Sequence, residues 1–567
     1  MSLNNNTIAC PLDCFDACEA ILDKGIIKAN KNHPTTKSKL CINFANLLKE
    51  NFLENAYIDK QKVSLDDALE KLVDKLKSVD PKKTLYYKGS GNLGVMQSFP
   101  KLFFDKYGST FTKGSLCDEA GAEGLIKGRG RCVNPPIEKL IDTDVIIVWG
   151  RNYSITSRHI YSLTKDKTFI TIDPCLTPIA KKSKLHLQIE PKTDYKLALL
   201  LTKIAYEKNL YDKELFERSN GEQFLKLAKQ ESRSFNKNDI GVSSEDIEKF
   251  FNIIEGKNIS IVLGIGIQKY FEAVDIARSI DSFAAFIGLH NSKKGGVWYL
   301  SDSSYSYEDK FIIKSKNKIA LPEVDFSKYD LVFIQGANPV VSAPNTKNVI
   351  KGLEKSFVVF FGTTYNDSCS YANIIIPSSN FKSKKDVRLS YGHQYKAVSY
   401  DLKQKQKNSI SEYEFTLYMN DKFRFEKLPN FEDIFEYYSK KEFVDESKVE
   451  NFNFLENIKI KDLYDKKRDD EYYLIFKKRK NNLNSQFKGD DFLYINPDCN
   501  FNENDRVIAK SQYGEAPFIL KFSENVKKGS IVLFAGNKNA NYLTTNSSDK
   551  EAFCAIFQEV LIKLDLP

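Results

Sequence analysis

The sequence predicts a multi-domain α/β protein with parallel sheets, followed by a C-terminal β-barrel domain. The chain has 567 residues, which is enough for about four domains of roughly 150 residues each. Up to about residue 400, short apolar runs alternate with helical periods, as they do in parallel sheets layered with helices. The end of the chain holds a series of short apolar runs separated by turn residues, which favours a small barrel.

The α/β region begins with a capped helix and continues as strands that end in loops. Ser64, with Asp67 three residues later, is a capping pair for a helix with its leucines on one face. Each apolar run that follows ends at turn residues; these runs are 84–87, 145–149, 169–172, 259–263, 331–334 and 357–361. A further helix is expected at 195–205. Because ligands of open α/β sheets bind outside the carboxyl ends of the strands, these loops predict a large nucleotide-like ligand.

The last third of the chain changes character twice. Residues 401–469 are rich in Lys, Asp, Glu, Phe and Tyr without a clear period, and we expect a connector with some helix there. The barrel strands are predicted at 472–476, 492–495, 506–509, 518–522 and 531–534. The sequence has no repeat of fixed short period and no linker rich in glycine and serine or in proline.

Composition and charge exclude several classes of protein. Apolar residues make up 42% and charged residues 28% of the chain, which excludes wholesale disorder. The net charge is +9, but the lysines are interleaved with acids, so no stripe that would bind nucleic acid is evident. No window reaches the ~18 consecutive apolar residues of a membrane span, and residues 1–9 carry no leader. We therefore expect a cytoplasmic protein without a nucleic-acid partner and without a direct membrane span.

The strongest chemical signal is a group of cysteines near the start. Cys10, Cys14, Cys18 and Cys41 form the pattern C-x3-C-x3-C-x22-C. Four thiolates in one N-terminal lobe have the number and softness that a [4Fe-4S] cluster requires. Zinc is the main alternative, although structural zinc sites more often use cysteine pairs with two-residue spacing. Four unrelated thiols are disfavoured, because four of the ten cysteines fall within the first 41 residues.

The surrounding residues resemble a known family. Residues 10–18, with His33-Pro34-Thr35 and Leu40-Cys41 after them, are similar to the cluster-binding start of the molybdopterin (molybdenum or tungsten) oxidoreductases, the dimethyl sulfoxide reductase and formate dehydrogenase superfamily. Later segments are similar to successive motifs of that family, in its order: Gly89-Ser90-Gly91-Asn92-Leu93-Gly94, Gly114-Ser115-Leu116-Cys117-Asp118, Trp149-Gly150-Arg151-Asn152, Ile172-Asp173-Pro174, Pro191-Lys192-Thr193-Asp194, Gly336-Ala337-Asn338-Pro339, Leu483-Asn484-Ser485-Gln486-Phe487 and Asn541-Tyr542-Leu543-Thr544. The resemblance covers nearly the whole chain.

The resemblance implies an architecture and a set of cofactors. It implies Rossmann-like parallel sheets around a cleft for two molybdopterin guanine dinucleotides (bis-MGD), which hold one molybdenum or tungsten. The expected domains are a 4Fe-4S lobe at 1–60, two interleaved Rossmann-like molybdopterin-binding units at 61–400, a connector at 401–469 and a dinucleotide-binding β-barrel at 470–567. The four N-terminal cysteines would hold a 4Fe-4S cluster that exchanges electrons with a partner protein.

The resemblance also implies individual site residues. Cys117 lies close to where relatives place the cysteine, selenocysteine or serine that ligates the metal, so it is the candidate catalytic residue and metal ligand. A simply packed thiol is the alternative. The candidate residues for binding the dinucleotides are Gly150, Asn152, Asp173, Asp194, Gly264, Gly266, Asn338 and Asn541. On spacing alone, an ordinary helix cap is the favoured interpretation of Asp194, and an ordinary turn residue is that of Asn152 and Asn338. His159 is expected to be a structural residue.

The sequence departs from the family pattern at three places. Asn43 stands where relatives commonly carry a lysine, and a neutral amide cannot supply a fixed positive charge. Lys192 stands where a glycine is usual, so we expect a reshaped loop there. The stretch 382–385 is basic where relatives are often acidic.

The leading functional hypothesis is a molybdopterin-dependent oxidoreductase that performs two-electron chemistry on a small substrate, formate or an oxyanion or sulfur compound. The alternative is a non-catalytic iron–sulfur subunit, for electron transfer or as a scaffold, that has lost the molybdenum or tungsten centre; Asn43 and Lys192 are the residues that favour it. A weaker alternative is non-redox chemistry such as hydration.

Overall fold

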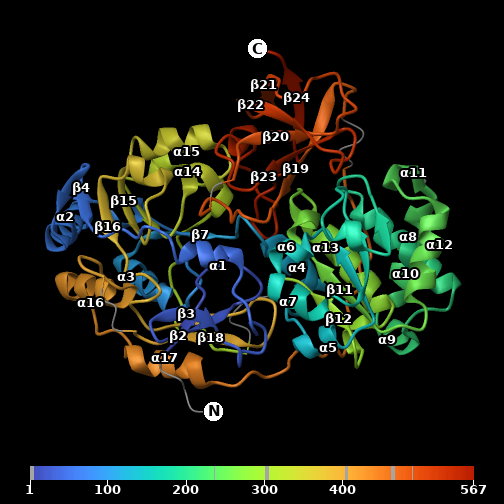
Figure 1. Cartoon of the computed structure of the whole chain (residues 1–567), viewed down its shortest axis with the longest axis horizontal. Coiled ribbons are helices and arrows are strands. Elements are labelled where there is room, and N and C mark those ends of the chain that lie inside the picture. Colours follow the sequence, from blue (N-terminus) through green and yellow to red (C-terminus); the bar gives the residue numbers. More distant parts are fainter. Residues whose placement is uncertain (1–5, 235–236, 301–305, 403–405, 462–466, 488) are drawn as a thin grey trace.

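The computed structural model describes residues 6–234, 237–300, 306–402, 406–461, 467–487 and 489–567 (Figure 1). Figure 1 shows an α/β unit on each side of the molecule, with a β-barrel above them and a small N-terminal lobe in front. The prediction of a multi-domain α/β fold with a C-terminal barrel is confirmed. The division into domains at residues 60, 400 and 469 stays a prediction.

The N-terminal lobe is a small antiparallel sheet. Its strands are β1 (Thr7–Ala9), β2 (Glu19–Asp23) and β3 (Ile26–Ala29), which pair in that order, and the helix α1 (Ile42–Leu47) follows. Ile8, Ala20 and Phe44 are fully buried between sheet and helix. Cys10 directly follows β1, and Cys41 stands at the N-cap of α1. The short elements of the lobe thus bring cysteines from both ends of a 32-residue segment into one place.

The smaller α/β unit is built on a parallel sheet with strand order β10-β9-β8-β11-β12. These strands are β8 (Val145–Trp149), β9 (Thr168–Ile172), β10 (Leu185–Leu187), β11 (Ile259–Leu263) and β12 (Gly296–Trp298). The helices of this part are α4 (Glu119–Arg129), α5 (Ile137–Ile141), α6 (Tyr153–Thr156), α7 (Arg158–Thr164), α8 (Asp194–Glu207), α9 (Lys213–Arg218), α10 (Gly221–Ser234), α11 (Lys237–Ile240), α12 (Ser244–Ile254) and α13 (Ala273–Phe286). β8 and β11 are almost wholly apolar and buried, as expected for parallel strands covered on both faces.

The larger unit has the strand order β13-β7-β6-β14-β15-β16-β4-β5. Its strands are β4 (Ala56–Ile58), β5 (Gln61–Val63), β6 (Thr84–Lys88), β7 (Thr110–Lys113), β13 (Lys318–Ala320), β14 (Leu331–Gln335), β15 (Phe357–Gly362) and β16 (Ile374–Pro377). Its helices include α2 (Leu65–Ser78), α3 (Phe99–Tyr107), α14 (Pro339–Ser342) and α15 (Thr346–Leu353). The chain leaves this sheet after β7, builds the whole smaller sheet and returns at β13, so the two units are interleaved.

The region 401–469, expected to be a connector with some helix, contains the packed helices α16 (Glu412–Phe423) and α17 (Phe431–Lys440). A hairpin of β17 (Asp386–Leu389) and β18 (Lys396–Ser399) precedes it. Phe415 of α16 stacks on Phe361 at a centroid distance of 4.9 Å. This segment therefore completes the core of the larger unit as well as linking it to the barrel.

The barrel closes through the pairing β19-β23-β20-β22-β21-β24. Its strands are β19 (Glu471–Lys477), β20 (Phe492–Ile495), β21 (Arg506–Lys510), β22 (Glu515–Phe522), β23 (Ser530–Phe534) and β24 (Leu561–Asp565). β24 was not predicted from the sequence, and it closes the barrel by pairing with both β19 and β21. Among the described residues, no helix is long and apolar enough to cross a membrane.

Candidate functional site

One cavity of about 620 Å³ lies where the two α/β units and the barrel meet. The loops that follow β6, β8, β11 and β14 line it, together with residues of the barrel around 536–541. The predicted gathering of loops at the carboxyl ends of the strands is therefore observed, and it involves both sheets at once. Each of the predicted dinucleotide-binding residues lines this cavity, as do Cys14 and Cys117.

The four N-terminal cysteines lie together beside this cavity. Cys10 and Cys18 are buried, and Cys14 and Cys41 are partly exposed. Burial raises the pKa of all four thiols, that of Cys14 to about 12. The charges of Cys14 and Cys41 raise the pKa of Cys10 and Cys18 further, because neighbouring thiolates repel each other. Such a crowded, desolvated set of soft donors fits a metal cluster, whose positive charge deprotonates coordinating thiols.

A histidine from the smaller unit contacts this cysteine group. His159 Nδ1 lies 3.2 Å from Cys18 Sγ and 3.2 Å from Asp16 Oδ2, and Asp16 also accepts from the backbone N–H of His159 at 2.9 Å. Burial lowers the pKa of His159, but the hydrogen bond to Asp16, the charge of Asp16 and the carbonyl of Lys39 together outweigh it, and the pKa is raised overall. Ligand atoms of Asp16, Cys18 and His159 lie within 4.8 Å of one another, as metal ligands would. His159 is thus a well-anchored residue, as the sequence indicated, and it also contacts a predicted cluster ligand.

Cys117 lies in the loop between β7 and α4 and lines the cavity. The hydroxyl of Ser115 holds this loop by accepting from the backbone N–H groups of Cys117 and Asp118 at 3.1 and 3.0 Å. Lys269 Nζ donates to the carbonyl of Cys117 at 2.8 Å. Burial, then the charges of Asp118 and Asp13, raise the pKa of the Cys117 thiol. The thiol therefore needs a nearby cation to act as a thiolate.

Asp13 is a residue of the site that the sequence analysis missed. It lines the cavity, and its carboxylate accepts from Tyr391 Oη at 3.0 Å and from Asn484 Nδ2 at 3.2 Å. Burial and the charge of Asp13 raise the pKa of Asp118. Asp13 lies inside the cysteine motif, so its position was visible in the sequence, but nothing there indicated that its charge acts on Cys117.

The predicted dinucleotide residues of the smaller unit form one group of polar atoms. Gly150 has a φ of +60°, which directs the chain away from the end of β8. Asn152 donates to the carbonyl of Lys478 in the barrel at 3.1 Å, while its Oδ1 is buried without a partner among the described residues. Asp194 accepts from Trp149 Nε1 at 2.7 Å, and burial raises its pKa to about 7. Burial also raises the pKa of Asp173.

The remaining predicted residues lie in the same cavity wall but have protein partners. A Cβ on Gly264 would lie 2.1 Å from the carbonyl oxygen of Gly150, so glycine is needed there for the close approach of two loops. Asn338 Oδ1 accepts from Ser368 Oγ at 2.9 Å, and Asn541 Nδ2 donates to Val341 O at 2.6 Å. These asparagine side chains shape the wall, and their amides are largely engaged within the protein.

Lys192 adopts the backbone conformation that favours glycine, with a φ of +69°. Its side chain is 1% exposed, and Nζ lies 2.8 Å from Glu559 and 2.7 Å from Glu272. Glu559 precedes β24 of the barrel and Glu272 precedes α13. The lysine therefore ties the loop before α8 to two other segments, and these ion pairs oppose the cost of the unusual conformation.

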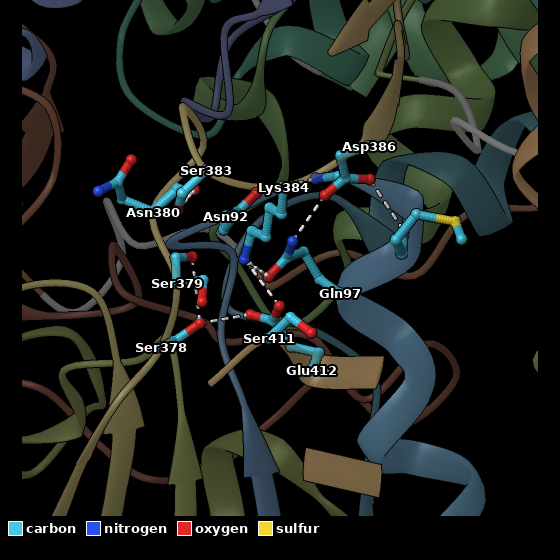
Figure 2. Close-up of polar contacts among 12 residues, drawn as sticks. Asn92, Gln97, Ser378, Ser379, Asn380, Ser383, Lys384, Asp386, Ser411 and Glu412 are labelled. Carbon is cyan, nitrogen blue, oxygen red and sulfur yellow. Dashed lines mark hydrogen bonds and ion pairs between the residues drawn. The ribbon is translucent and has the colours of Figure 1, made fainter. Parts of the chain in front are cut away.

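Two lysines of the basic stretch 382–385 pair with carboxylates of the following helices. Figure 2 shows Lys384 between Glu412 and Gln97, with Nζ 2.7 Å from Glu412 Oε2 and 3.2 Å from Gln97 Oε1. Ser378 donates to the other oxygen of Glu412 at 2.7 Å. Lys385 pairs with Glu432 at 2.8 Å. Gln97, Ser378 and Glu412 line the cavity, so this buried network forms its wall at the larger unit.

Comparisons with known proteins identify the class to which this fold belongs. The structure of acetylene hydratase from Pelobacter acetylenicus matches with a TM-score of 0.79 over 99% of this chain and 100% of that one, at 15% sequence identity. At that identity the match establishes a shared fold. A family model described as molybdopterin oxidoreductase matches residues 60–400, which is more than half of the chain. The chain belongs to the molybdopterin oxidoreductase family.

Several curated relatives are recognisable in sequence. The chain is 25% identical over 439 residues to a probable oxidoreductase, YyaE, of Bacillus subtilis, which covers 67% of this chain and 63% of that protein. It is 23% identical to the F420-dependent formate dehydrogenase subunit alpha of Methanocaldococcus jannaschii over 63% of this chain and 61% of the relative. It is 24% identical to the assimilatory nitrate reductase catalytic subunit of Bacillus subtilis over 66% and 62%. The chain thus spans somewhat less than two thirds of these relatives.

Proposed function

We propose that this chain is a molybdenum or tungsten bis-MGD oxidoreductase that performs two-electron chemistry on a small substrate, with a [4Fe-4S] cluster passing the electrons on. The observation that carries the proposal is the cavity of about 620 Å³, which extends from Cys14 of the cysteine group to Cys117 and is lined by loops of both sheets. A ligand with two similar halves, one at each sheet, suits such a cavity.

Each part of the site has a role in this proposal. When bound, the metal centre supplies the two-electron chemistry and the cluster supplies one-electron exchange. Cys10, Cys14, Cys18 and Cys41 hold the cluster, and Cys117 provides a soft thiolate ligand to the metal. Asp173 and Asp194 of the smaller unit accept hydrogen bonds from the dinucleotide that lies there.

The carboxyl group of Asp118, next to Cys117 in the chain, holds a proton in this proposal. The pKa of Asp118 is raised by burial and by Asp13, so Asp118 keeps its proton to a higher pH than an exposed aspartate does. Two-electron conversions of small substrates usually take up or release protons, which a buried carboxyl group in the cavity wall can hold. Asp118 is therefore the proposed proton-holding residue.

The proposal includes a class of substrate and a separate electron partner. Formate, an oxyanion such as nitrate, or a sulfur compound is the proposed substrate, since formate dehydrogenases and a nitrate reductase are among the relatives. One of those relatives is named as an alpha subunit. We propose by analogy that this chain passes electrons to a separate protein.

Metal analysis of anaerobically purified protein tests the proposal. We expect about four irons per chain, about one molybdenum or tungsten, and about two guanine nucleotides released on denaturation. Iron without a heavier metal would support the alternative, an electron-transfer or scaffold subunit. Absence of both iron and the heavier metal would overturn the proposal. Turnover of formate, nitrate, thiosulfate and sulfoxides with a redox dye then selects the substrate.

A further inference from the structure

The residue at position 43, near the cysteine group, supplies no positive charge. Asn43, two residues after Cys41, lines the cavity, and its Oδ1 is buried without a hydrogen-bond partner among the described residues. An amide carries no net charge. Any fixed positive charge that faces the cysteines must therefore come from another element.

Arg388 on β17 lies against the cysteine loop. Its side chain is among the largest that are fully buried, with 1% exposure. Nη2 donates to the carbonyl of Cys14 at 2.9 Å, and Nη1 donates to the carbonyl of Leu389. The guanidinium carbon lies 5.4 Å from the centre of the Tyr391 ring. The hydroxyl of the same tyrosine donates to Asp13. The guanidinium is thus fixed on three sides at the boundary between the cysteine group and the cavity.

The contacts of Arg388 hold it in place without cancelling its charge. Both acceptors are neutral carbonyl oxygens, and Nε is buried without a partner among the described residues. A guanidinium carries a positive charge, and the field of a buried charge is weakly screened.

We propose that Arg388 is the built-in positive charge that sets the reduction potential of the N-terminal iron–sulfur cluster. This inference rests on the proposed function, because it requires a cluster at the four cysteines. An electron added to the cluster increases its negative charge, and a nearby fixed cation stabilises that state more than the oxidised one. The reduction potential of the cluster is therefore higher with Arg388 than without it.

A second arginine provides a matched control. Arg158 lines the cavity and directly precedes His159, whose Nδ1 lies 3.2 Å from Cys18 Sγ. Arg158 is only partly buried, whereas Arg388 is fully buried. Because water screens a partly exposed charge, removing Arg158 should move the potential of the cluster less than removing Arg388.

The test is a potentiometric titration of the full-length protein, with the reduced cluster followed by electron paramagnetic resonance and the iron content measured in each variant. Arg388→Gln and Arg388→Met remove the charge, Arg388→Lys retains it, and Arg158→Gln is the control. We expect the Gln and Met variants to make reduction at least tenfold less favourable, which for one electron is a shift of about 59 mV to lower potential. The Lys variant should keep most of the wild-type potential.

Each outcome decides between roles. Gln and Met variants with full iron and an unchanged potential would overturn the proposal, and so would a Lys variant whose potential falls as far as that of the Gln variant. If the Gln and Met variants fail to fold while Lys folds, the charge of Arg388 serves structure and the proposal is wrong. A wild-type protein without iron would instead overturn the proposed function itself.

Discussion

Cys117, Asp13 and Asp118 show how burial prepares single residues for chemistry. The pKa of the Cys117 thiol and that of the Asp118 carboxyl are both raised, first by desolvation and then by neighbouring negative charge. A cation entering the cavity would gain a thiolate ligand by displacing the proton of Cys117. The residues are thus suited to a metal, and the following substitution tests the role of the thiol.

Replacing Cys117 by alanine should abolish turnover while leaving iron unchanged. Turnover should fall by on the order of 100-fold or more, since a ligand to the reacting metal is lost. The iron content should not change, because the four N-terminal cysteines remain. Cys499→Ala is the control, since Cys499 is a partly exposed thiol of the barrel that does not line the cavity. Full activity in the Cys117 variant would show that the thiol is only a packing residue.

At Lys192, an unfavourable backbone conformation is opposed by two buried ion pairs. Lys192→Met would leave Glu559 and Glu272 close together without their cation, and we expect a loss of about 3 to 5 kcal/mol in the free energy of unfolding. Lys192→Gly would relieve the backbone strain but lose the same ion pairs, so it should also destabilise. Chemical denaturation measures both variants.

The controls for Lys192 use other charges of the chain. Lys385→Met removes a lysine whose ion pair with Glu432 is largely exposed, so the change should stay within about 1 kcal/mol. Combining Lys192→Met with Glu559→Gln should recover part of the loss, since the uncompensated carboxylate is then removed. A Lys192→Met protein as stable as the wild type would show that the buried ion pairs contribute nothing.

At the scale of elements, buried carboxylates join segments that the sequence separates. Asp386 at the start of β17 accepts from the backbone N–H of Met96 at 2.9 Å and from Gln97 Nε2 at 2.6 Å (Figure 2). It thereby attaches the hairpin that carries Arg388 to the segment that follows β6. Burial raises the pKa of Asp386 to about 6.

This pKa predicts how stability depends on pH. Below the ordinary aspartate pKa of 3.8, both the folded and the unfolded state hold the proton of Asp386. Between there and about pH 6 the folded state binds more protons, so the contribution of Asp386 to stability falls as pH rises. Asp386→Asn stays neutral, and its melting temperature minus that of the wild type should therefore rise from pH 4 to 6 and then level off.

A second aspartate gives the opposite sign. The hydroxyl of Ser327 lowers the pKa of Asp325. The wild type therefore gains stability from Asp325 as pH rises through the acid range. The melting temperature of Asp325→Asn minus that of the wild type should fall over this range. Melting temperatures measured at a series of pH values check both variants. A difference for Asp386→Asn that does not vary with pH would contradict the raised pKa.

The elements show where sequence patterns succeed. Continuous apolar runs bounded by turn residues located β8, β11 and β14 well, because strands buried on both faces need such runs. The sequence pattern predicts α16 only as part of a connector with some helix, because charged and aromatic residues alternate along it without a clear period. Ser411 and Glu414 do form a capping box at its start, a signal that the sequence contained.

At the scale of the whole molecule, the cavity exists only because three parts meet. Loops of the smaller sheet, loops of the larger sheet and the barrel each supply part of the wall. Asn152 reaches the barrel through Lys478, and Lys192 reaches it through Glu559. A ligand that fills the cavity should therefore stabilise the contacts between all three parts.

Hydrogen exchange with and without the pterin cofactor tests this expectation. Protein from a host that cannot make the cofactor should exchange faster than loaded protein in the backbone of the lining loops: 89–92, 150–152, 264–266, 336–338 and 536–541. The helices α10 and α12, far from the cavity wall, serve as an internal control. Protection confined to the loops of one sheet would show that one dinucleotide is held instead of two.

The sequence by itself determined the α/β class, most of the strands, the cysteine group and the loops that line the cavity, because burial and turn chemistry leave periodic local patterns. Only the tertiary structure brought the charge of Asp13 to act on Cys117, and placed His159 beside Cys18 and Arg388 against the carbonyl of Cys14. The last two pairs join residues 141 and 374 positions apart. The field at a buried group depends on which distant side chains share its low-dielectric surroundings, and no local pattern encodes that.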